Sequence, residues 1–182
     1  MDGFVNVDSE AACEPDLVWD LEQTPWPWED DSASEVWLIH ALEHMGRDPA
    51  VFLAIMKELY RVLEPGGKAV IHVPHPRSDD FVSDPTHVRP VTPSTLRMFD
   101  RRLNEHLQAD GFSNTPLALY TGVDLVLAET RTIIDQEVLD ELQAGRITEA
   151  EVRQMIKRQN NVATEFRFVL QARKPHWTAT QA

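Results

Sequence analysis

The sequence predicts one α/β domain built as three layers around a mostly parallel sheet with one late antiparallel strand. Two observations support this prediction. Short apolar runs typical of strands alternate with runs of helical period, and the turn Pro65-Gly66-Gly67 separates the clearest helix from the clearest strand. A strand, helix and strand in succession imply a parallel, right-handed crossover. The domain is expected to span residues 1–173, and residues 174–182 are expected to form a flexible C-terminal tail.

Three short strands are predicted in the first quarter of the chain. Phe4–Val7 and Leu17–Trp19 are apolar runs that are each followed by an aspartate. Residues 23–34 contain two prolines and are predicted to be an extended loop, because proline fixes φ and removes a hydrogen-bond donor. Val36–Ile39 is the third predicted strand.

The central helix has the strongest pattern. Asp48 and Pro49 are suited to the N-cap and the first turn. The apolar residues that follow at helical spacing are Phe52, Ile55, Met56, Leu59, Val62 and Leu63. Gly66 and Gly67 are expected to end the helix, and Lys68–Val73 is the fourth predicted strand.

In the second half of the chain, strand-like and helix-like patterns alternate less regularly. Thr92 is expected to cap a helix whose apolar stripe is Leu96, Phe99, Leu103 and Leu107. The further predicted elements are strands at Leu117–Tyr120, Val123–Ile134 and Thr164–Ala172, and helices at residues 135–144 and 148–159. This pair of helices before the last strand could form a homodimer contact.

Composition narrows the classes of protein. An apolar content of 42% excludes a disordered chain. No apolar run approaches the 18 residues of a membrane span, and no signal peptide is visible. Cys13 is the only cysteine, so an internal disulfide is ruled out and a cytoplasmic location is expected. Cys13 itself is expected to be inert.

The charge is strongly asymmetric. The net charge is −13, and the first 46 residues contain twelve carboxylates and no Lys or Arg. Such a region repels phosphate backbones, so a nucleic-acid substrate is disfavoured. A nucleotide cofactor remains compatible, because ribose hydroxyls can donate hydrogen bonds to a carboxylate. The alternative is a solvated acidic face that aids solubility.

Two candidate sites lie where predicted strands end. Asp8 and Asp20 each follow a strand, and ligands of open parallel sheets bind beyond the carboxyl ends of the strands. Either aspartate could equally be a turn residue. Trp26 and Trp28, in the proline-rich loop, could stack on a ligand ring or cover the edge of the core.

The segment His40-Ala-Leu-Glu43-His44 matches an inverted zinc-protease pattern. That chemistry needs two imidazoles one turn apart on a regular helix. Gly46 breaks the chain two residues later, which argues against a metalloprotease. His44 could instead have a structural role, hydrogen-bonded beneath the sheet.

A polar loop from Pro74 to Thr92 follows the fourth strand and is rich in titratable groups. His75 and His87 have the intrinsic pKa of a general base near neutral pH, although each could be a turn residue. A metal site is conceivable from His75, Asp79, Asp80, Asp84 and His87, but their spacing is not diagnostic, and no metal is predicted.

The motifs Asn6-Val7-Asp8, Leu42-Glu43-His44 and Arg61-Val62-Leu63-Glu64-Pro65-Gly66-Gly67 resemble those of class I S-adenosylmethionine-dependent methyltransferases over roughly residues 3–100. The resemblance implies a Rossmann-like sheet that binds S-adenosyl-L-methionine. Asp8 would bind the ribose, and Asp20 and Leu21 would border the adenine. His40 and His44 would lie at the methionine end of the cofactor. The helical pair at residues 135–159 is additional to the minimal family plan.

One departure from the family is large. The family's first strand and its glycine-rich turn have no counterpart before Gly3, so the fold is expected to be N-terminally truncated. That strand would lie between Phe4–Val7 and Val36–Ile39, and each buried backbone group left unpaired there costs about 1–3 kcal/mol. The true start could lie upstream, the protein could be a shortened non-enzyme, or Val123–Ile134 or a partner chain could fill the gap.

The functional prediction is methyl transfer from S-adenosylmethionine to a small-molecule or sugar acceptor, with His75 or His87 as the base for a hydroxyl acceptor. The alternative is a non-catalytic interaction module that resembles methyltransferases but has lost cofactor binding.

Overall fold

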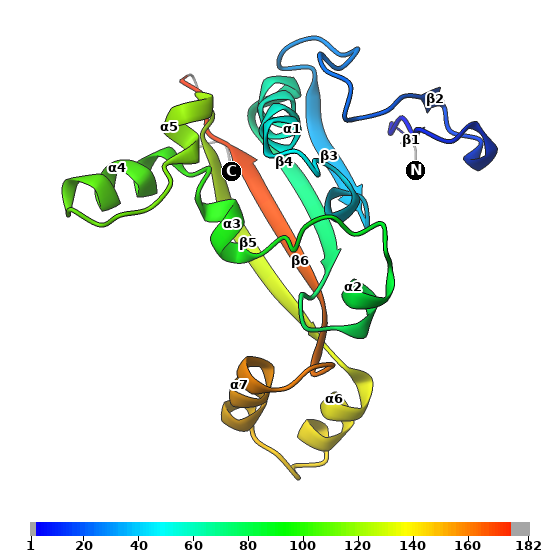
Figure 1. Ribbon diagram of the computed structural model, residues 1–182, viewed down its shortest axis with the longest axis vertical. Coiled ribbons are helices and arrows are strands. Elements are labelled where there is room, and N and C mark those ends of the chain that lie inside the picture. Colours follow the sequence, from blue (N-terminus) through cyan, green and yellow to red (C-terminus); the bar gives the residue numbers. More distant parts are fainter. Residues whose placement is uncertain (1–2, 176–182) are drawn as a thin grey trace.

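A computed structural model describes residues 3–175 of the chain. Its main sheet has the strand order β3-β4-β6-β5, formed by Ala33–Ile39, Leu63–Pro74, Ala163–Ala172 and Leu125–Ile134 (Figure 1). Strand β3 pairs in parallel with β4, whereas β6 runs antiparallel to both of its neighbours. The α/β class and the late antiparallel strand are therefore confirmed.

Strands β3 and β4 are linked by helix α1, Pro49–Val62, which forms the predicted strand–helix–strand unit. The Asp48 side chain accepts a 2.8 Å hydrogen bond from the Ala50 N–H, as expected of an N-cap. All six apolar residues of the predicted stripe are buried.

The predicted end of this helix at Gly66 and Gly67 was wrong. The helix ends at Val62, and Leu63 already pairs with Ala33. The Pro-Gly-Gly turn instead lies within β4, at a register irregularity opposite Ala33 and Glu35.

The N-terminal segment forms a separate two-stranded parallel sheet of β1, Val7–Asp8, and β2, Leu17–Val18, with the short 3-10 helix η1, Ala11–Cys13, between them. Figure 1 shows this segment beside the free edge of β3. Within residues 3–175 no strand pairs with that edge. The suggestion that Val123–Ile134 fills the gap was wrong, because β5 pairs with β6 at the opposite edge.

Between β4 and β5 the chain forms four short helices: α2, Asp79–Ser83; α3, Pro93–Arg97; α4, Arg101–Ala109; and α5, Leu117–Thr121. The single helix predicted from the stripe at Leu96–Leu107 is broken, because Asp100 caps a new helix by accepting from the Leu103 N–H. Leu117–Tyr120 was predicted as a strand and is helical, enclosed by Pro116 and Gly122.

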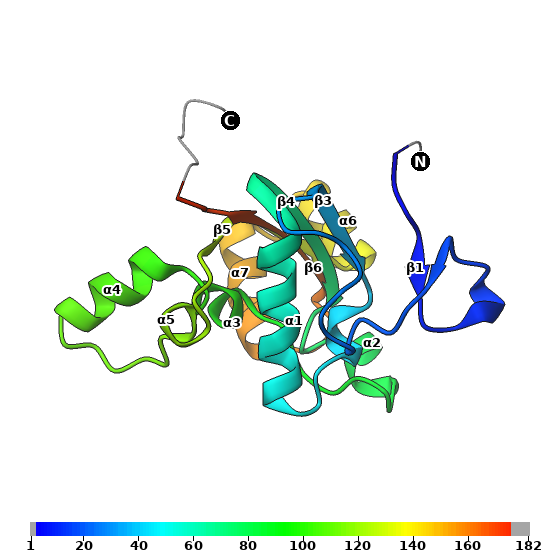
Figure 2. The ribbon, with the colours of Figure 1, turned by 90° about the horizontal axis from the view of Figure 1, so that it is seen from above.

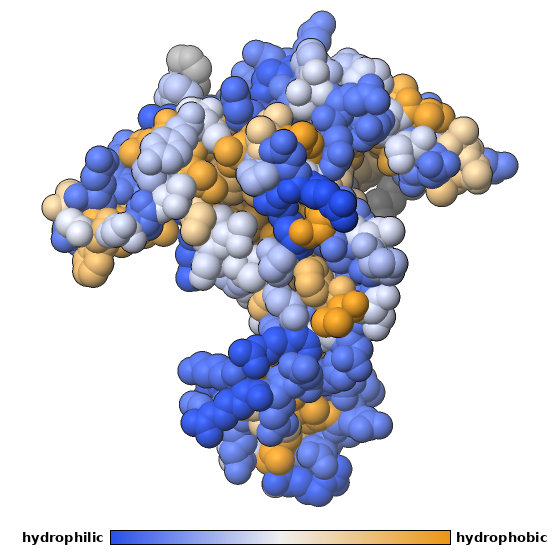
Figure 3. All heavy atoms as spheres, in the orientation of Figure 1, coloured by the Kyte–Doolittle hydropathy of each residue, from blue (hydrophilic) through white to orange (hydrophobic). Residues whose placement is uncertain are grey.

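The two helices before the last strand are α6, Gln136–Gln143, and α7, Glu149–Arg158. The predicted capping box is present, with Thr148 and Glu151 each accepting from the other's backbone N–H. The two helices form a small lobe at the far end of β5 and β6 (Figure 1). The outer surface of this lobe is mostly hydrophilic, with apolar atoms visible between its helices (Figure 3).

Helices α1, α3 and α5 lie on one side of the main sheet (Figure 2). The core between sheet and helices includes Leu38, Ile71, Phe168 and Leu170, all at most 3% exposed. Trp26 joins this core at 4% exposure, which confirms that it covers the core edge. Among residues 3–175, no helix combines the length and apolar character that a membrane crossing demands.

Candidate functional site

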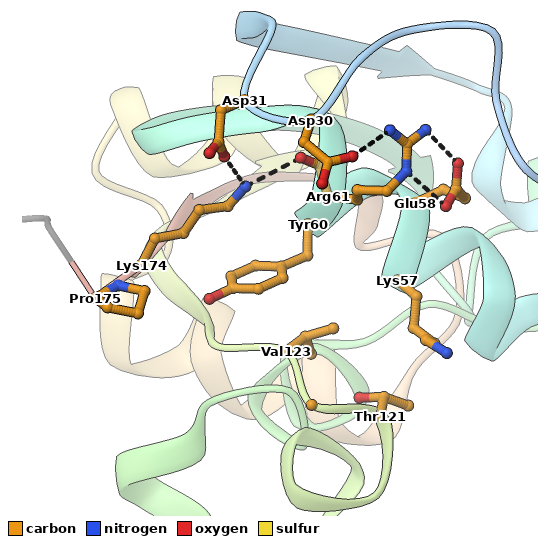
Figure 4. Close-up of a pocket in the computed structure, with 11 residues that line it drawn as sticks. Asp30, Asp31, Lys57, Glu58, Tyr60, Arg61, Thr121, Val123, Lys174 and Pro175 are labelled. Atoms are coloured by element: carbon orange, nitrogen blue, oxygen red, sulfur yellow. Dashed lines mark hydrogen bonds and ion pairs between the residues drawn. The ribbon is translucent and has the colours of Figure 1, made fainter.

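One cavity, of about 490 Å³, lies beside the C-terminal half of α1. Figure 4 shows its ion pairs: Arg61 binds Glu58 and Asp30, and Lys174 binds Asp31. The hydrogen bond from Arg61 lowers the pKa of Glu58. Because these charges are already paired with one another, the cavity resembles a structural ion-pair network more than a reactive centre.

The second cavity, about 400 Å³, lies at the carboxyl ends of the parallel strands β3 and β4. This is the position at which open parallel sheets bind ligands. Its walls are His40, Glu43, His44, Pro74, Asp80, Asp84, His87, Thr164 and Glu165. The cavity therefore combines three imidazoles with four carboxylates.

The turn after β3 brings the first wall into place. His40 leaves the strand in the left-handed region, at φ 49°, and Leu42–His44 forms the 3-10 helix η2. Gly46 follows at φ 69°, and a Cβ there would lie 2.6–2.8 Å from Phe52 atoms, so only glycine fits. The Gly46 N–H donates a hydrogen bond to the Glu22 carboxylate, and the Gly46 carbonyl accepts one from the Arg89 guanidinium.

The loop after β4 supplies the second wall. Asp84 Oδ1 accepts from the Thr86 N–H at 2.8 Å and from the Thr86 hydroxyl at 2.6 Å. The Val88 N–H then donates to the Glu43 carbonyl at 2.9 Å, which ties this loop to η2. The loop thereby brings His87 against His44, with ring centroids 4.5 Å apart.

Glu43 is the most unusual residue of the site. It is 1% exposed, and neither carboxylate oxygen has a hydrogen-bond partner among the described residues. His40 Nδ1 and His87 Nε2 lie 3.5 and 4.0 Å from its Oε1. A buried carboxylate without donors is costly, so this position favours a cation or a donating ligand.

His75, predicted as a base, does not line the cavity. It is 6% exposed, and its ring packs on Phe166 with centroids 4.6 Å apart. Its Nδ1 accepts from the Arg77 N–H at 3.2 Å, and burial lowers its pKa. Nearby His72, 3.2 Å from Glu165 Oε1, also has a pKa lowered by burial, which Glu165 partly opposes.

The structure brings together the predicted residues His40, His44 and His87 and leaves Asp8, Asp20 and Leu21 outside the cavity walls. Asp8 and Asp20 each accept the backbone N–H two residues later, at 2.8 and 2.9 Å, as turn aspartates do.

Sequence reasoning considered Glu43 only within the zinc-protease pattern and the Leu42-Glu43-His44 motif, and it missed Glu165 as a lining residue. The His40-x-x-Glu43-His44 pattern was a signal for Glu43, but its meaning depends on His87, more than forty residues away. Glu165 alternates within an ordinary strand pattern and gave no separate signal.

Residues 2–71 match a family model described as a methyltransferase domain. A comparison with curated protein sequences found no match.

Among solved structures, a SAM-dependent methyltransferase from Archaeoglobus fulgidus is 19% identical with a TM-score of 0.53, and the match covers 85% of this chain and 66% of that one. A SAM-dependent methyltransferase from Methanosarcina mazei is 13% identical with a TM-score of 0.45, over 85% of this chain and 65% of that one. This chain therefore spans slightly less than two thirds of either protein. The likeness to the first establishes that the chain has the Rossmann-like fold of SAM-dependent methyltransferases.

Proposed function

We propose that the protein belongs to the class I methyltransferases and takes part in methyl transfer from S-adenosylmethionine to a small-molecule or sugar acceptor. The observation that carries the proposal is the cavity at the carboxyl ends of β3 and β4. The methyltransferase-domain match over residues 2–71 and the shared fold support it.

The chemistry of the cavity fits this cofactor. Its four carboxylates favour a cation, and a sulfonium is positively charged. We propose that His40 and His44 border the methionine end of the cofactor and that Asp8, Asp20 and Leu21 contact its nucleoside. S-adenosylmethionine supplies an electrophilic methyl group, so the protein's task is alignment, with proton removal needed only for a hydroxyl acceptor.

Of the two predicted bases, we propose His87 as the one that acts, because it lines the cavity. Its Nδ1 lies 2.8 Å from the Phe81 carbonyl, which can only accept, so Nδ1 carries the proton and Nε2 has the free lone pair. His75 is buried with its Nδ1 already accepting from a backbone N–H.

The alternative is a non-catalytic interaction module. The separation of β1 and β2 from the main sheet favours it, because Asp8 and Asp20 then lie apart from the carboxyl-end cavity. In this function the chain would not bind the cofactor tightly.

Calorimetric titration with S-adenosylmethionine distinguishes methyl transfer from the non-catalytic interaction module. We expect weak binding by the 182-residue chain and tight binding by a form extended upstream by an apolar strand and a glycine-rich loop. In the extended form, Asp8→Ala should weaken binding by about 1–3 kcal/mol, and the control Glu29→Ala, which removes an exposed carboxylate, should not. Absence of cofactor binding by the extended form would leave the interaction module as the surviving function.

A further inference from the structure

We propose that Glu43, His44 and His87 form a binding site for a divalent transition-metal ion of the Zn²⁺ class. One ligand atom from each residue lies within 4.8 Å of the other two. The site is built from two segments distant in sequence, the η2 turn and the loop after β4. It needs neither a cofactor nor an acceptor, so it goes beyond the proposed methyl transfer.

The buried carboxylate points to a ligand. Glu43 is 1% exposed, and both of its oxygens lack hydrogen-bond partners among residues 3–175. Buried charges in proteins are paired or coordinate metals. The nearest cationic candidates are imidazoles at 3.5 and 4.0 Å, too far for a hydrogen bond.

The hydrogen bonds of His87 prepare its ring for coordination. Its Nδ1 must donate to the Phe81 carbonyl, which leaves the Nε2 lone pair on the side of Glu43, 4.0 Å from Oε1. Metal-binding histidines characteristically donate their second ring N–H to a carbonyl or carboxylate.

His44 has an equivalent arrangement. Its Nδ1 lies 2.9 Å from the Thr86 hydroxyl oxygen, and that hydroxyl donates its only proton to Asp84 Oδ1 at 2.6 Å. Thr86 must therefore accept from His44, so Nδ1 carries the proton and Nε2 is free to bind an ion. Thr86 and Asp84 thus act as positioning residues for the imidazole.

Spacing and donor type decide which ion fits. Ligands around a tetrahedral Zn²⁺ lie about 3.4 Å apart, so modest side-chain rotations close gaps that are no wider than 4.8 Å here. Two imidazoles and a carboxylate suit Zn²⁺ and Fe²⁺, whereas Mg²⁺ and Ca²⁺ prefer oxygen ligands alone. Asp84 Oδ2, 3.9 Å from His87 Nε2, is placed to provide a fourth ligand.

The test is a titration of the chelator-treated full chain with Zn²⁺, followed by calorimetry, and with Co²⁺, followed by visible absorption. We expect one ion per chain. His44→Ala, His87→Ala and Glu43→Gln should each weaken binding by more than about 100-fold, beyond the roughly 10–100-fold effect of an outer positioning residue. Thr86→Val should fall within that smaller range.

Two controls identify adventitious binding. His106→Ala removes an exposed histidine that is paired with Asp110, and Cys13→Ser removes the exposed thiol. Both variants should bind as the wild type does. Because Glu43→Gln removes a buried charge, its metal-free form should unfold at no lower denaturant concentration than the wild type, so its lost binding cannot be attributed to misfolding.

No Zn²⁺ or Co²⁺ binding by the wild type would overturn the proposal. So would binding that survives in His44→Ala and His87→Ala, or binding that disappears in either control. The titration contains neither S-adenosylmethionine nor an acceptor, so ion binding and methyl transfer are measured separately. An ion on His87 Nε2 would occupy the lone pair proposed to accept the acceptor's proton, so His87 would act as the base only in the ion-free protein.

Discussion

Glu43 Oε1 lies 4.0 Å from His87 Nε2, inside the protein and without a hydrogen bond between them. The first residue follows β3 and the second follows β4, so this approach joins the two segments that enclose the carboxyl-end cavity. The unpaired carboxylate has consequences for stability that can be measured directly.

Glu43→Gln should increase the free energy of unfolding in the presence of a chelator by about 1–3 kcal/mol. The substitution removes a buried charge without donors, and the new amide N–H can donate to the His87 Nε2 lone pair. Urea denaturation with EDTA measures the change. Glu105→Gln, an exposed position on α4, is the matched control and should alter stability little. A destabilised Glu43→Gln protein would show that the carboxylate has a donor in solution.

Gly46→Ala should destabilise the protein by about 3 kcal/mol or more, because both a left-handed conformation and a collision within 2.6–2.8 Å of Phe52 are imposed. Gly145→Ala is a matched control with the same φ of 69° and nothing within 4 Å of the added Cβ. It should cost only about 1–2 kcal/mol. Equal effects of the two substitutions in denaturant melts would contradict the close approach.

The buried neutral imidazole of His75 should make stability depend on pH. Burial lowers its pKa in the folded state from the ordinary value of 6.5, so the unfolded chain binds more protons as the pH falls below that value. The contribution of the neutral imidazole to the free energy of unfolding is therefore present above about pH 6.5 and is lost toward lower pH. His75→Asn keeps an acceptor for the Arg77 N–H and should flatten the curve below pH 6.5. His106→Asn, at an exposed position, should leave it unchanged.

Arg173→Met should destabilise the protein by about 2–3 kcal/mol. Arg173 binds Asp100 and Asp124 at 2.6 and 2.7 Å, and all three side chains are at most 19% exposed, so its loss leaves two poorly hydrated carboxylates unpaired. Arg153→Met provides the comparison, since its pair with Glu149 is largely exposed and worth less than about 1 kcal/mol. A small effect at Arg173 in urea melts would mean that the two aspartates are solvated.

Local patterns predicted the strand–helix–strand unit well. The cap at Asp48 and the spacing of the apolar stripe of α1 both depend on residues that lie within one helical turn of each other. The strand prediction at Leu117–Tyr120 failed because a run of four apolar residues cannot report that Pro116 and Gly122 enclose a single helical turn. The prediction of a single helix from Leu96 to Leu107 failed because Asp100 caps a second helix in the middle of the apolar stripe.

The candidate site was predictable only in part. His40, His44 and His87 were found as polar residues after strands, and the cavity contains all three. Their relation to Glu43 depends on backbone hydrogen bonds between segments far apart in the chain, such as Val88 N–H to the Glu43 carbonyl. No periodicity encodes such a contact, so the unpaired carboxylate emerges only in three dimensions.

Ile134 and Ala163 are register partners at the rung where β5 ends and β6 begins. Helices α6 and α7 are therefore inserted between two residues that pair at the end of the sheet. The length of this insertion has no effect on the order or the register of the strands. The open turn at Gly145, where an added Cβ would meet no atom within 4 Å, is thus a natural place to graft a fluorescent reporter or an affinity domain.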